Sequence, residues 1–208
     1  THIGLMGTFA GVFIGLLMFL GGTWYSGEIT DANIQSLIAG VLVSMITSWE
    51  IYTIDDIYAL TEGERAELID GHIYYMAPPS RTHQKISMEL SSLIREYIRT
   101  NKGKCEVYAA PFAVYLDEKT NTYVEPDISV ICDTSKLDDK GCKGAPDWII
   151  EIVSPSSKRM DYYTKLFKYR TAGVREYWLV DPSKDIILVY NFEQEYSEQY
   201  TFKDSVRA

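Results

Sequence analysis

Apolar and polar side chains alternate with two different periods along the chain, and these periods predict which segments are helices and which are strands. Residues 80–100 carry apolar side chains at helical spacing, which predicts an amphipathic helix. Residues 66–76 predict a hairpin that turns at Asp70-Gly71, a dipeptide that two-residue β-turns favour. The pattern also predicts a short helix at 53–60, strands at 105–110, 112–116, 174–180 and 185–192, and an edge strand at 195–202.

Two apolar runs, residues 123–131 and 148–153, contain carboxylates among aliphatic neighbours. Runs of this kind are typical of strands that are covered on both faces. An ionised carboxylate in such a strand, here Asp127 or Glu151, is costly unless a cation, a hydrogen-bond donor or water meets it. Mg²⁺ binds through one or two carboxylates together with a substrate phosphate. A shared divalent metal is therefore the simplest explanation for both acids.

A predicted helix over residues 158–171 follows the second run and places Asp161 and Lys165 four residues apart on one face. Acids followed by a lysine in this order suggest a metal-dependent phosphodiesterase. Structural explanations stay open at this point, since perturbed carboxylates also occur in purely structural networks. Asp127 follows a proline and could end a loop, Glu151 could pair with a buried arginine, and Lys165 could be a surface lysine paired with its helical neighbour.

The order of the predicted elements favours an α+β fold with a central mixed β-sheet flanked by helices. A chain of 208 residues can hold one sizeable core with an appendage. We therefore divide the chain into a hydrophobic N-terminal segment, residues 1–50, and a domain that carries the candidate chemistry, residues 51–208.

The N-terminal segment contains no lysine or arginine, and residues 3–20 form an apolar run with Thr8 as its clearly polar member. This run reaches the length of a transmembrane helix. Glycines at positions 7, 11 and 15 form the small-residue stripe that lets membrane helices approach closely. We expect a membrane-spanning segment, and a soluble hydrophobic hairpin or a joining error in the sequence is the alternative. Because the chain starts at Thr1, it resembles a fragment of a longer reading frame.

The net charge of −9 argues against a protein that binds nucleic acid non-specifically over its whole surface. Basic residues are nevertheless concentrated in two segments. Residues 81–104 contain six basic and two acidic side chains, and residues 158–176 again contain six and two. Basic segments in an acidic chain suit a nuclease that binds its substrate in a cleft, although a solvated helix face explains them nearly as well.

The three cysteines, Cys105, Cys132 and Cys142, are odd in number and include no CxxC pair. They match neither a disulfide framework nor a zinc site. We therefore predict reduced thiols in a cytosolic domain. The three histidines are scattered along the chain and form no ligand cluster.

From about residue 52 to residue 192 the chain resembles the Uma family of restriction endonucleases, a branch of the PD-(D/E)xK nuclease superfamily. The resemblance covers roughly two thirds of the chain, with its motifs in the family's order. It rests on Glu67-Leu68-Ile69-Asp70-Gly71, Met76-Ala77-Pro78-Pro79-Ser80 with His83-Gln84, Glu125-Pro126-Asp127, Glu151-Ile152-Val153-Ser154-Pro155-Ser156, Asp161 with Lys165 and Tyr169, and residues 172–182.

The resemblance implies a restriction-endonuclease-like core and assigns roles to individual residues. Asp127 and Glu151 would bind Mg²⁺, or Mn²⁺ in its place, together with the backbone carbonyl of Ile152. Lys165 would orient the attacking water or stabilise charge on the phosphate, and Glu67 would be an additional acid near the metal. The superfamily lysine normally follows the second acid by two residues, where this chain has Val153, so the lysine has moved to the following helix.

Alternatives remain for the flanking residues. Glu67 could be a solvent-facing hairpin residue. His83, at the start of a predicted helix, could contact phosphate, but capping or packing explains it better. Tyr169, Tyr177 and Trp178 suit a core better than a base-stacking surface.

Together these inferences predict a Mg²⁺-dependent endonuclease that hydrolyses DNA. The expected partners are the DNA substrate, a membrane bound through residues 1–50, and a second copy of the chain. The nuclease domain would lie in the cytoplasm. One alternative is a catalytically silent nuclease-fold domain that binds nucleic acid or protein. Another is a membrane ion-channel subunit with a nuclease-like tail, because residues 1–48 weakly resemble a segment of MotA/TolQ/ExbB-type proton channels.

Overall fold

A computed structural model describes residues 31–32, 34–35, 37–39, 51–117 and 121–206. The chain divides into two units, Thr1–Ile51 and Tyr52–Ala208. The apolar run at residues 3–20, and with it the expected membrane segment, lies outside the described residues. Among the residues that are described, no helix is both long and apolar enough to cross a membrane.

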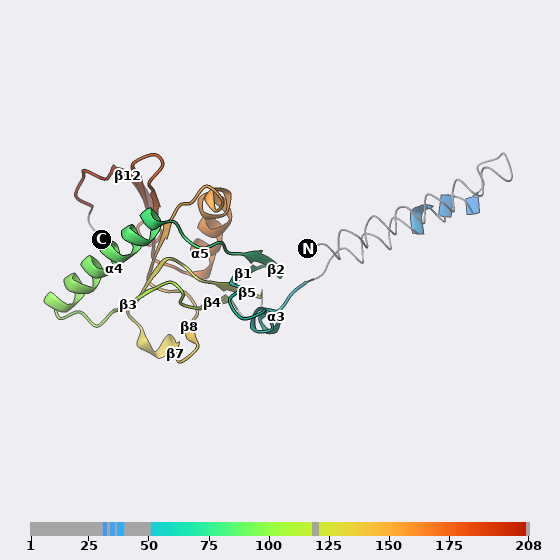
Figure 1. The fold of residues 1–208 in the computed structure, drawn as a ribbon, viewed down its shortest axis with the longest axis horizontal. Helices are drawn as coiled ribbons and strands as arrows, with labels where there is room; N and C mark the ends of the chain where they lie inside the picture. The colour runs from blue at the N-terminus through green and yellow to red at the C-terminus, as the bar shows by residue number, and fades with distance from the viewer. Residues whose placement is uncertain (1–30, 33, 36, 40–50, 118–120, 207–208) are drawn as a thin grey trace. The chain divides into compact units, whose positions relative to one another are not determined.

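The second unit is built on two six-stranded sheets rather than the one central sheet that the sequence predicted (Figure 1). Both sheets are mixed, since β4 pairs in parallel with β8 and β9 pairs in parallel with β10. The first has the order β2-β1-β5-β4-β8-β7, comprising Ala66–Ile69 (β1), His72–Tyr75 (β2), Val114–Asp117 (β4), Thr122–Val124 (β5), Leu137–Asp138 (β7) and Gly141–Lys143 (β8). The second has the order β12-β11-β10-β9-β6-β3, comprising Glu106–Ala109 (β3), Ile128–Ile131 (β6), Trp148–Ile152 (β9), Glu176–Asp181 (β10), Ile186–Asn191 (β11) and Tyr196–Thr201 (β12).

The predicted strand at 123–131 is divided between these sheets. Residues up to Val124 belong to β5 in the first sheet, and residues from Ile128 belong to β6 in the second. Pro126 lies at the division, where it lacks an N–H for a strand ladder and restricts the backbone of Glu125. The chain therefore passes from one sheet to the other next to Asp127.

The hairpin at β1 and β2 is confirmed, and its turn explains its register. Asp70 and Gly71 both have positive φ, 52° and 75°, as a type I′ turn requires of its central residues. Ala66 is paired with Tyr75 and Ile69 with His72, so the strands meet in register on either side of the turn. The turn thus fixes the direction in which β1 presents Glu67.

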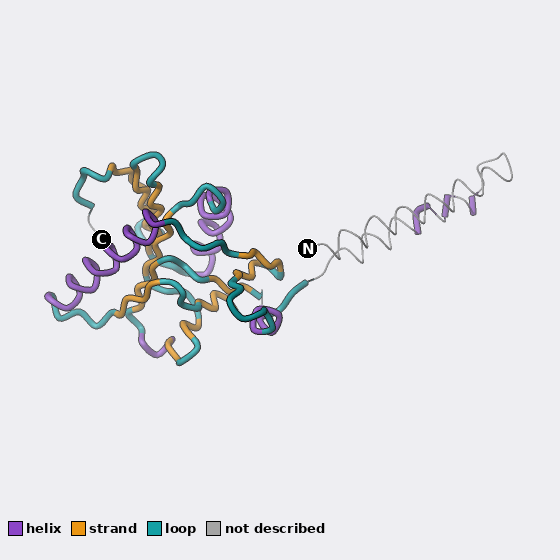
Figure 2. The backbone as a smooth tube through the Cα atoms, viewed as in Figure 1, coloured by secondary structure: helices purple, strands orange, loops and turns teal. Residues whose placement is uncertain are grey.

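Helices cover the second sheet on opposite faces (Figure 2). Helix α4 (Arg81–Thr100) packs Ile86, Leu90 and Ile94 onto a cluster that includes Ile150 and Ile152 of β9. Helix α5 (Leu166–Ala172) packs onto the cluster that includes Ile149 and Val153. Because successive side chains of a strand point to opposite faces, Glu151 shares the α5 side with those two residues.

The predicted helix at 158–171 consists of two parts with different hydrogen bonding. A π-helical segment, η2 (Met160–Lys165), leads into α5, which ends at Gly173 with φ 94°. π-helical turns are frequent at functional sites. The segment η2 buries both Asp161 and Lys165, so the charged pair that spacing suggested lies inside the protein. The described residues of the second unit also form helix α3 (Ile54–Tyr58) and the 3-10 turn η1 (Thr134–Lys136).

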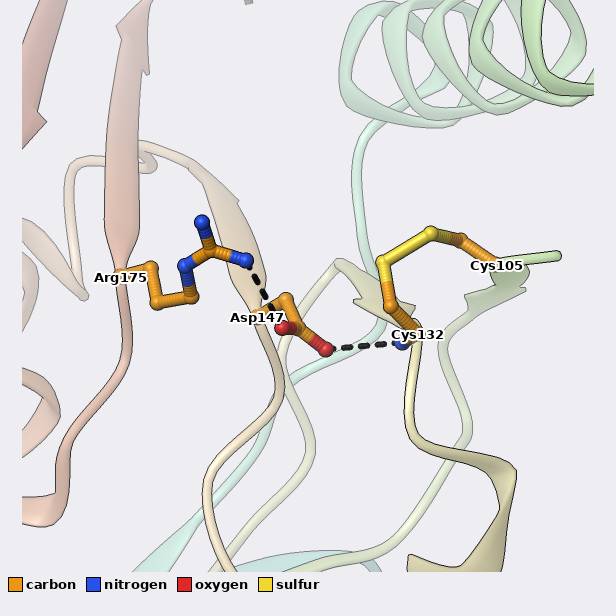
Figure 3. Close-up of a disulfide and its surroundings, with 4 residues drawn as sticks. All are labelled: Cys105, Cys132, Asp147 and Arg175. Carbon is orange, nitrogen blue, oxygen red and sulfur yellow. Dashed lines mark hydrogen bonds and ion pairs between the residues drawn. A yellow bond between two sulfur atoms is a disulfide. The ribbon is translucent and has the colours of Figure 1, made fainter. Parts of the chain in front are cut away.

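The prediction that all three cysteines are reduced thiols is wrong, because Cys105 and Cys132 form a disulfide (Figure 3). The antiparallel register of β3 and β6 pairs Glu106 with Ile131, and continuing it by one position places the two cysteines opposite each other. Their Cα atoms are 3.9 Å apart. Cross-strand pairing needs no CxxC spacing, which is why counting motifs did not reveal it. Cys142 is buried and has a free thiol.

The disulfide joins the residue before β3 to the residue after β6 at the edge of the second sheet, and neither cysteine lines the cleft that contains Asp127 and Glu151. The backbone N–H of Cys132 donates to Asp147 Oδ2 at 2.7 Å, and Arg175 is 3.5 Å from the other oxygen of that carboxylate (Figure 3). Arg175 also bonds Glu193. These contacts connect the starts of β9 and β10 to the end of β6.

Replacing both Cys105 and Cys132 with serine should lower the free energy of unfolding by about 3–4 kcal/mol, the chain-entropy contribution of a disulfide that spans 27 residues. Urea unfolding of the oxidised chain and of the double variant measures the difference. Reductant should lower the stability of the unaltered chain to that of the variant and leave the variant unchanged. Equal stability of the unaltered chain with and without reductant would contradict the prediction.

Candidate active site

A cleft of about 700 Å³ brings the predicted site residues together between the hairpin, the start of α4 and the π-helical segment. Glu67 comes from β1, Asp127 from the residue before β6, Glu151 from β9, and Lys165 from η2. Ile152 also lines the cleft. All five residues that the sequence analysis assigned to the site therefore meet in one place, although they come from four separate segments.

Lys165 is a buried residue at the centre of the cleft, not a surface lysine. Its Nζ donates to Glu67 Oε1 at 2.7 Å and to Glu151 Oε1 at 2.9 Å, and it lies 3.9 Å from Asp161 Oδ1. Burial alone would lower the pKa of Lys165, but the charges of Glu151, Glu67 and Asp161 raise it well above its usual value. The side chain is therefore a permanent cation among carboxylates.

Glu151 is the penultimate residue of β9, and the hydrogen bonds that the structure describes for its side chain are all made by one carboxylate oxygen, Oε1. Oε1 accepts from Lys165 and from the Tyr169 hydroxyl, the latter at 2.6 Å. Oε2 accepts no hydrogen bond from the part of the chain that the structure describes. Burial raises the pKa of Glu151 well above its usual value; the charge of Lys165 opposes that rise, and nearby carboxylates, Asp127 first among them, add to it.

Asp127, which directly precedes β6, contacts residues of β9 and of helix α4. Its Oδ2 accepts from the backbone N–H of Ile152 at 2.7 Å and lies 3.1 Å from His83 Nε2. The hydrogen bond with Asp127 raises the pKa of His83, while burial opposes that shift. His83 Nδ1 is buried and has no hydrogen-bond partner among the described residues. His83 therefore contacts a carboxylate of the site, a role that the sequence reasoning did not consider.

Glu67 is buried, with 4 % of its surface exposed, so the solvent-facing alternative is wrong. Its Oε1 accepts both from Lys165 and from the backbone N–H of Glu125 at 3.0 Å. The carboxylate of Glu125 itself faces other partners, since it binds Arg65 and the Tyr123 hydroxyl. Glu67 thus bonds both Lys165 and the backbone of Glu125, where the chain passes from the first sheet to the second.

Two further residues belong to the site more closely than sequence reasoning had assigned. Asp161 is buried, and its burial raises its pKa to about 6, although Lys165 and Ser157 oppose the shift. Tyr169 is a core residue, as predicted, but its hydroxyl also donates to Glu151. The spacing of these residues could have indicated that they lie beside Lys165, because positions 161, 165 and 169 recur at helical intervals and so share one face.

The two candidate metal ligands lie on adjacent antiparallel strands. The register of β6 and β9 pairs Ile128 with Ile150, and continuing it places Asp127 opposite Glu151. Directly opposed residues have neighbouring side chains on one face of the sheet. In the described part of the chain, no group of three or more His, Cys, Asp and Glu side chains is arranged to hold an ion. A site of two carboxylates completed by a carbonyl, water and phosphate needs only these two acids.

The charges in the cleft favour a divalent cation. Three carboxylates, from Glu67, Glu151 and Asp161, lie within 3.9 Å of the Lys165 ammonium. Asp127 lines the same cleft as a fourth, so carboxylates outnumber the lysine they accompany. That excess is one reason why the pKa values of Glu151 and Asp161 are raised, since each added carboxylate favours a bound proton. A divalent cation would neutralise the same excess. The residues present therefore fit Mg²⁺.

Comparison with known proteins places these residues in a family. The family model named Uma2, with the description "Putative restriction endonuclease", matches residues 53–207. Two uncharacterized proteins of Synechocystis sp. are similar in sequence. One, slr1290, is 30 % identical over 62 % of this chain and 66 % of its own length, and the other, sll1609, is 28 % identical over 57 % and 67 %.

The fold is similar to that of a solved structure. It is the crystal structure of a "putative nuclease belonging to DUF820" from Anabaena variabilis, with a TM-score of 0.62 and 23 % identity. The match covers 75 % of this chain and 88 % of that one. The second unit therefore shares its fold with that protein, which confirms the predicted nuclease-like α+β core but not its single central sheet.

Proposed function

The chain belongs to the Uma2 family of restriction-endonuclease-like proteins, and from that premise we propose that it is a Mg²⁺-dependent endonuclease that hydrolyses DNA. The observation that carries the proposal is the buried Lys165 between Glu67 and Glu151, in the same cleft as Asp127. A buried ionic cluster is a poor source of stability, because desolvation offsets much of the attraction. Strongly perturbed charges in a cleft are typical of a catalytic site.

In this proposal each residue of the chain has a separate task. Asp127 and Glu151 would hold the metal together with the carbonyl of Ile152, and Mn²⁺ could replace Mg²⁺. The bound ion would polarise a non-bridging phosphate oxygen and lower the pKa of an attacking water. Lys165 offsets the negative charge that builds on the phosphate oxygens. Its Nζ has three N–H donors and hydrogen-bonds two carboxylates, which leaves one donor for water or phosphate.

Four neighbouring groups support these tasks by fixing the orientation of the side chains. Tyr169 holds one oxygen of Glu151 and leaves the other for the ion. Glu67, on β1 of the first sheet, positions the Lys165 ammonium through a hydrogen bond. The Ile152 N–H and His83 both bind Oδ2 of Asp127, which would leave Oδ1 to bind the ion. Residues that act through another group in this way are positioning residues.

The proposal predicts that the full chain nicks or linearises plasmid DNA with Mg²⁺ or Mn²⁺ and loses this activity in chelator. Gel electrophoresis of supercoiled plasmid measures the loss, and restoring the metal should restore cleavage. Parallel reactions with single-stranded DNA and with RNA identify the substrate. Cleavage that continues in excess chelator would remove the metal from the mechanism. No cleavage with either metal on any of the three substrates would leave the catalytically silent domain as the better account.

A further inference from the structure

The cleft cannot attract DNA by the charge of its own walls. Apart from His83, two cationic side chains line it, Arg65 and Lys165, and both are paired with carboxylates. The acids described above give the interior an excess of negative charge. Because a phosphate backbone binds through cations that replace its counterions, the affinity for DNA must come from basic residues beside the cleft.

Helix α4 carries a straight line of such residues on its outer face. Arg81, Lys85, Arg95 and Arg99 are all exposed, and with Met88 and Ser92 they recur at intervals of four and three. Residues at these intervals share one face of a helix. The opposite face packs on the sheet, so the line faces solvent. From Arg81 to Arg99 it is roughly 27 Å long at 1.5 Å per residue.

The line begins at the cleft. Ser80 and Thr82 both line the cleft, so Arg81 lies at its margin, and the helix then leads away from it. Lys85 lies 3.7 Å from Glu89, and Arg99 lies 2.8 Å from Glu96. Arg81 and Arg95 have no ion pair or side-chain hydrogen bond within the described ranges. Two positive charges on this face are thus uncompensated.

A second pair of uncompensated cations borders the cleft from another segment. Lys158 and Arg159 are exposed and lie between Ser157 and Met160, which both line the cleft. Neither has an ion pair among the residues that the structure describes. Their segment leads directly into η2, which carries Lys165. Cations from two distant parts of the sequence therefore border the same acidic cleft.

We propose that Arg81 and Arg95 on α4, together with Lys158 and Arg159, bind the sugar–phosphate backbone of the DNA substrate on either side of the scissile bond. The inference rests on the proposed function and adds to it the surface that holds the substrate. Contacts of this kind fix the position of the duplex and are independent of base sequence. The charge pattern explains how a chain with a net charge of −9 binds a polyanion locally.

Salt dependence of DNA binding tests the surface. Binding of a fluorescent duplex to the full chain is measured in chelator, so that no cleavage occurs, at several salt concentrations. Each phosphate contact contributes about −0.9 to the slope of log K against log salt. Arg81→Gln with Arg95→Gln, and separately Lys158→Gln with Arg159→Gln, should each reduce the magnitude of the slope by about 2. All four substitutions together should reduce it by about 3–4, equally for unrelated duplex sequences.

The control is Lys140→Gln with Lys203→Gln, two exposed lysines away from the cleft lining that change the net charge equally. It should keep the slope of the unaltered chain, and thermal unfolding checks that every variant is folded. The inference is overturned if the fourfold variant keeps its slope, if the control loses as much, or if the unaltered chain does not bind DNA at low salt. Binding with the expected slopes but without metal-dependent cleavage would refute the proposed function and leave this surface in place.

Discussion

Replacing Glu151 with glutamine should abolish metal-dependent cleavage and leave the protein folded. The amide keeps an oxygen that can accept from Lys165 and Tyr169, the two donors that bind Oε1 in the structure. It removes a negative charge from a buried cluster in which negative charge is in excess, so folding should not suffer. The rate should fall by at least about 10²–10³, the loss expected from one preorganised charge contact, because the metal is lost with the charge.

The matched control is Glu176→Gln, the same chemical change at the start of β10. Glu176 is half-buried, accepts from Trp178 and Asn191, and is paired with Trp148 at the other end of β9 from Glu151. The Glu176→Gln variant should keep the cleavage rate of the unaltered chain. Calorimetric titration with Mn²⁺ should show weaker binding in Glu151→Gln alone, while thermal unfolding of both variants should resemble that of the unaltered chain. Full cleavage by folded Glu151→Gln would show that this carboxylate is not a metal ligand.

The parts of the fold that sequence reasoning predicted are those that local patterns determine. The hairpin followed from its Asp70-Gly71 turn, and α4 followed from the spacing of its apolar face. The positions of Asp127 and Glu151 in buried runs showed that something must compensate their charge. Their proximity is also a matter of register, because adjacent antiparallel strands place them opposite each other.

The parts that were missed depend on which distant segments pair. The resemblance assigned Glu67 to the site, but the local pattern left open a solvent-facing hairpin residue. Glu67 is separated from Lys165 by 98 residues, and only the folding of β1 beside η2 makes it a buried partner. Nothing in the alternation of β1 indicates that packing. The division of residues 123–131 between two sheets and the disulfide between β3 and β6 have the same origin. Propensity identifies strands, whereas long-range contacts decide their partners.

The position of the proposed catalytic lysine gives the strongest test of the site, because the PD-(D/E)xK superfamily, which the sequence resembles, carries its lysine where this chain has Val153. Val153 is two residues beyond Glu151, so their side chains share the face that packs against α5. Val153 lines the cleft together with Lys165 and is itself buried. An ammonium at position 153 would therefore enter the same cluster from the strand instead of from the helix.

Replacing Lys165 with alanine should lower the cleavage rate by about 10²–10³. It should also lower the free energy of unfolding by about 3–5 kcal/mol, since Glu67 and Glu151 lose their buried counter-charge. Lys165→Arg should restore little, because a planar guanidinium does not replace a compact ammonium. Single-turnover cleavage and urea unfolding measure the two effects separately. A folded Lys165→Ala variant with the full rate would show that Lys165 has no part in catalysis.

Adding Val153→Lys to Lys165→Ala should recover part of both losses, because the cluster regains one positive charge within reach of the same carboxylates. The space that the Lys165 side chain leaves accommodates the longer residue at position 153, which limits the overpacking that Val153→Lys alone would cause. Val153→Met with Lys165→Ala is the matched control, since methionine extends into the same space without a charge. Equal cleavage rates in the lysine and methionine double variants would refute the role of the ammonium. A higher rate in the lysine variant would show that catalysis requires the positive charge, whether the strand or the helix carries it.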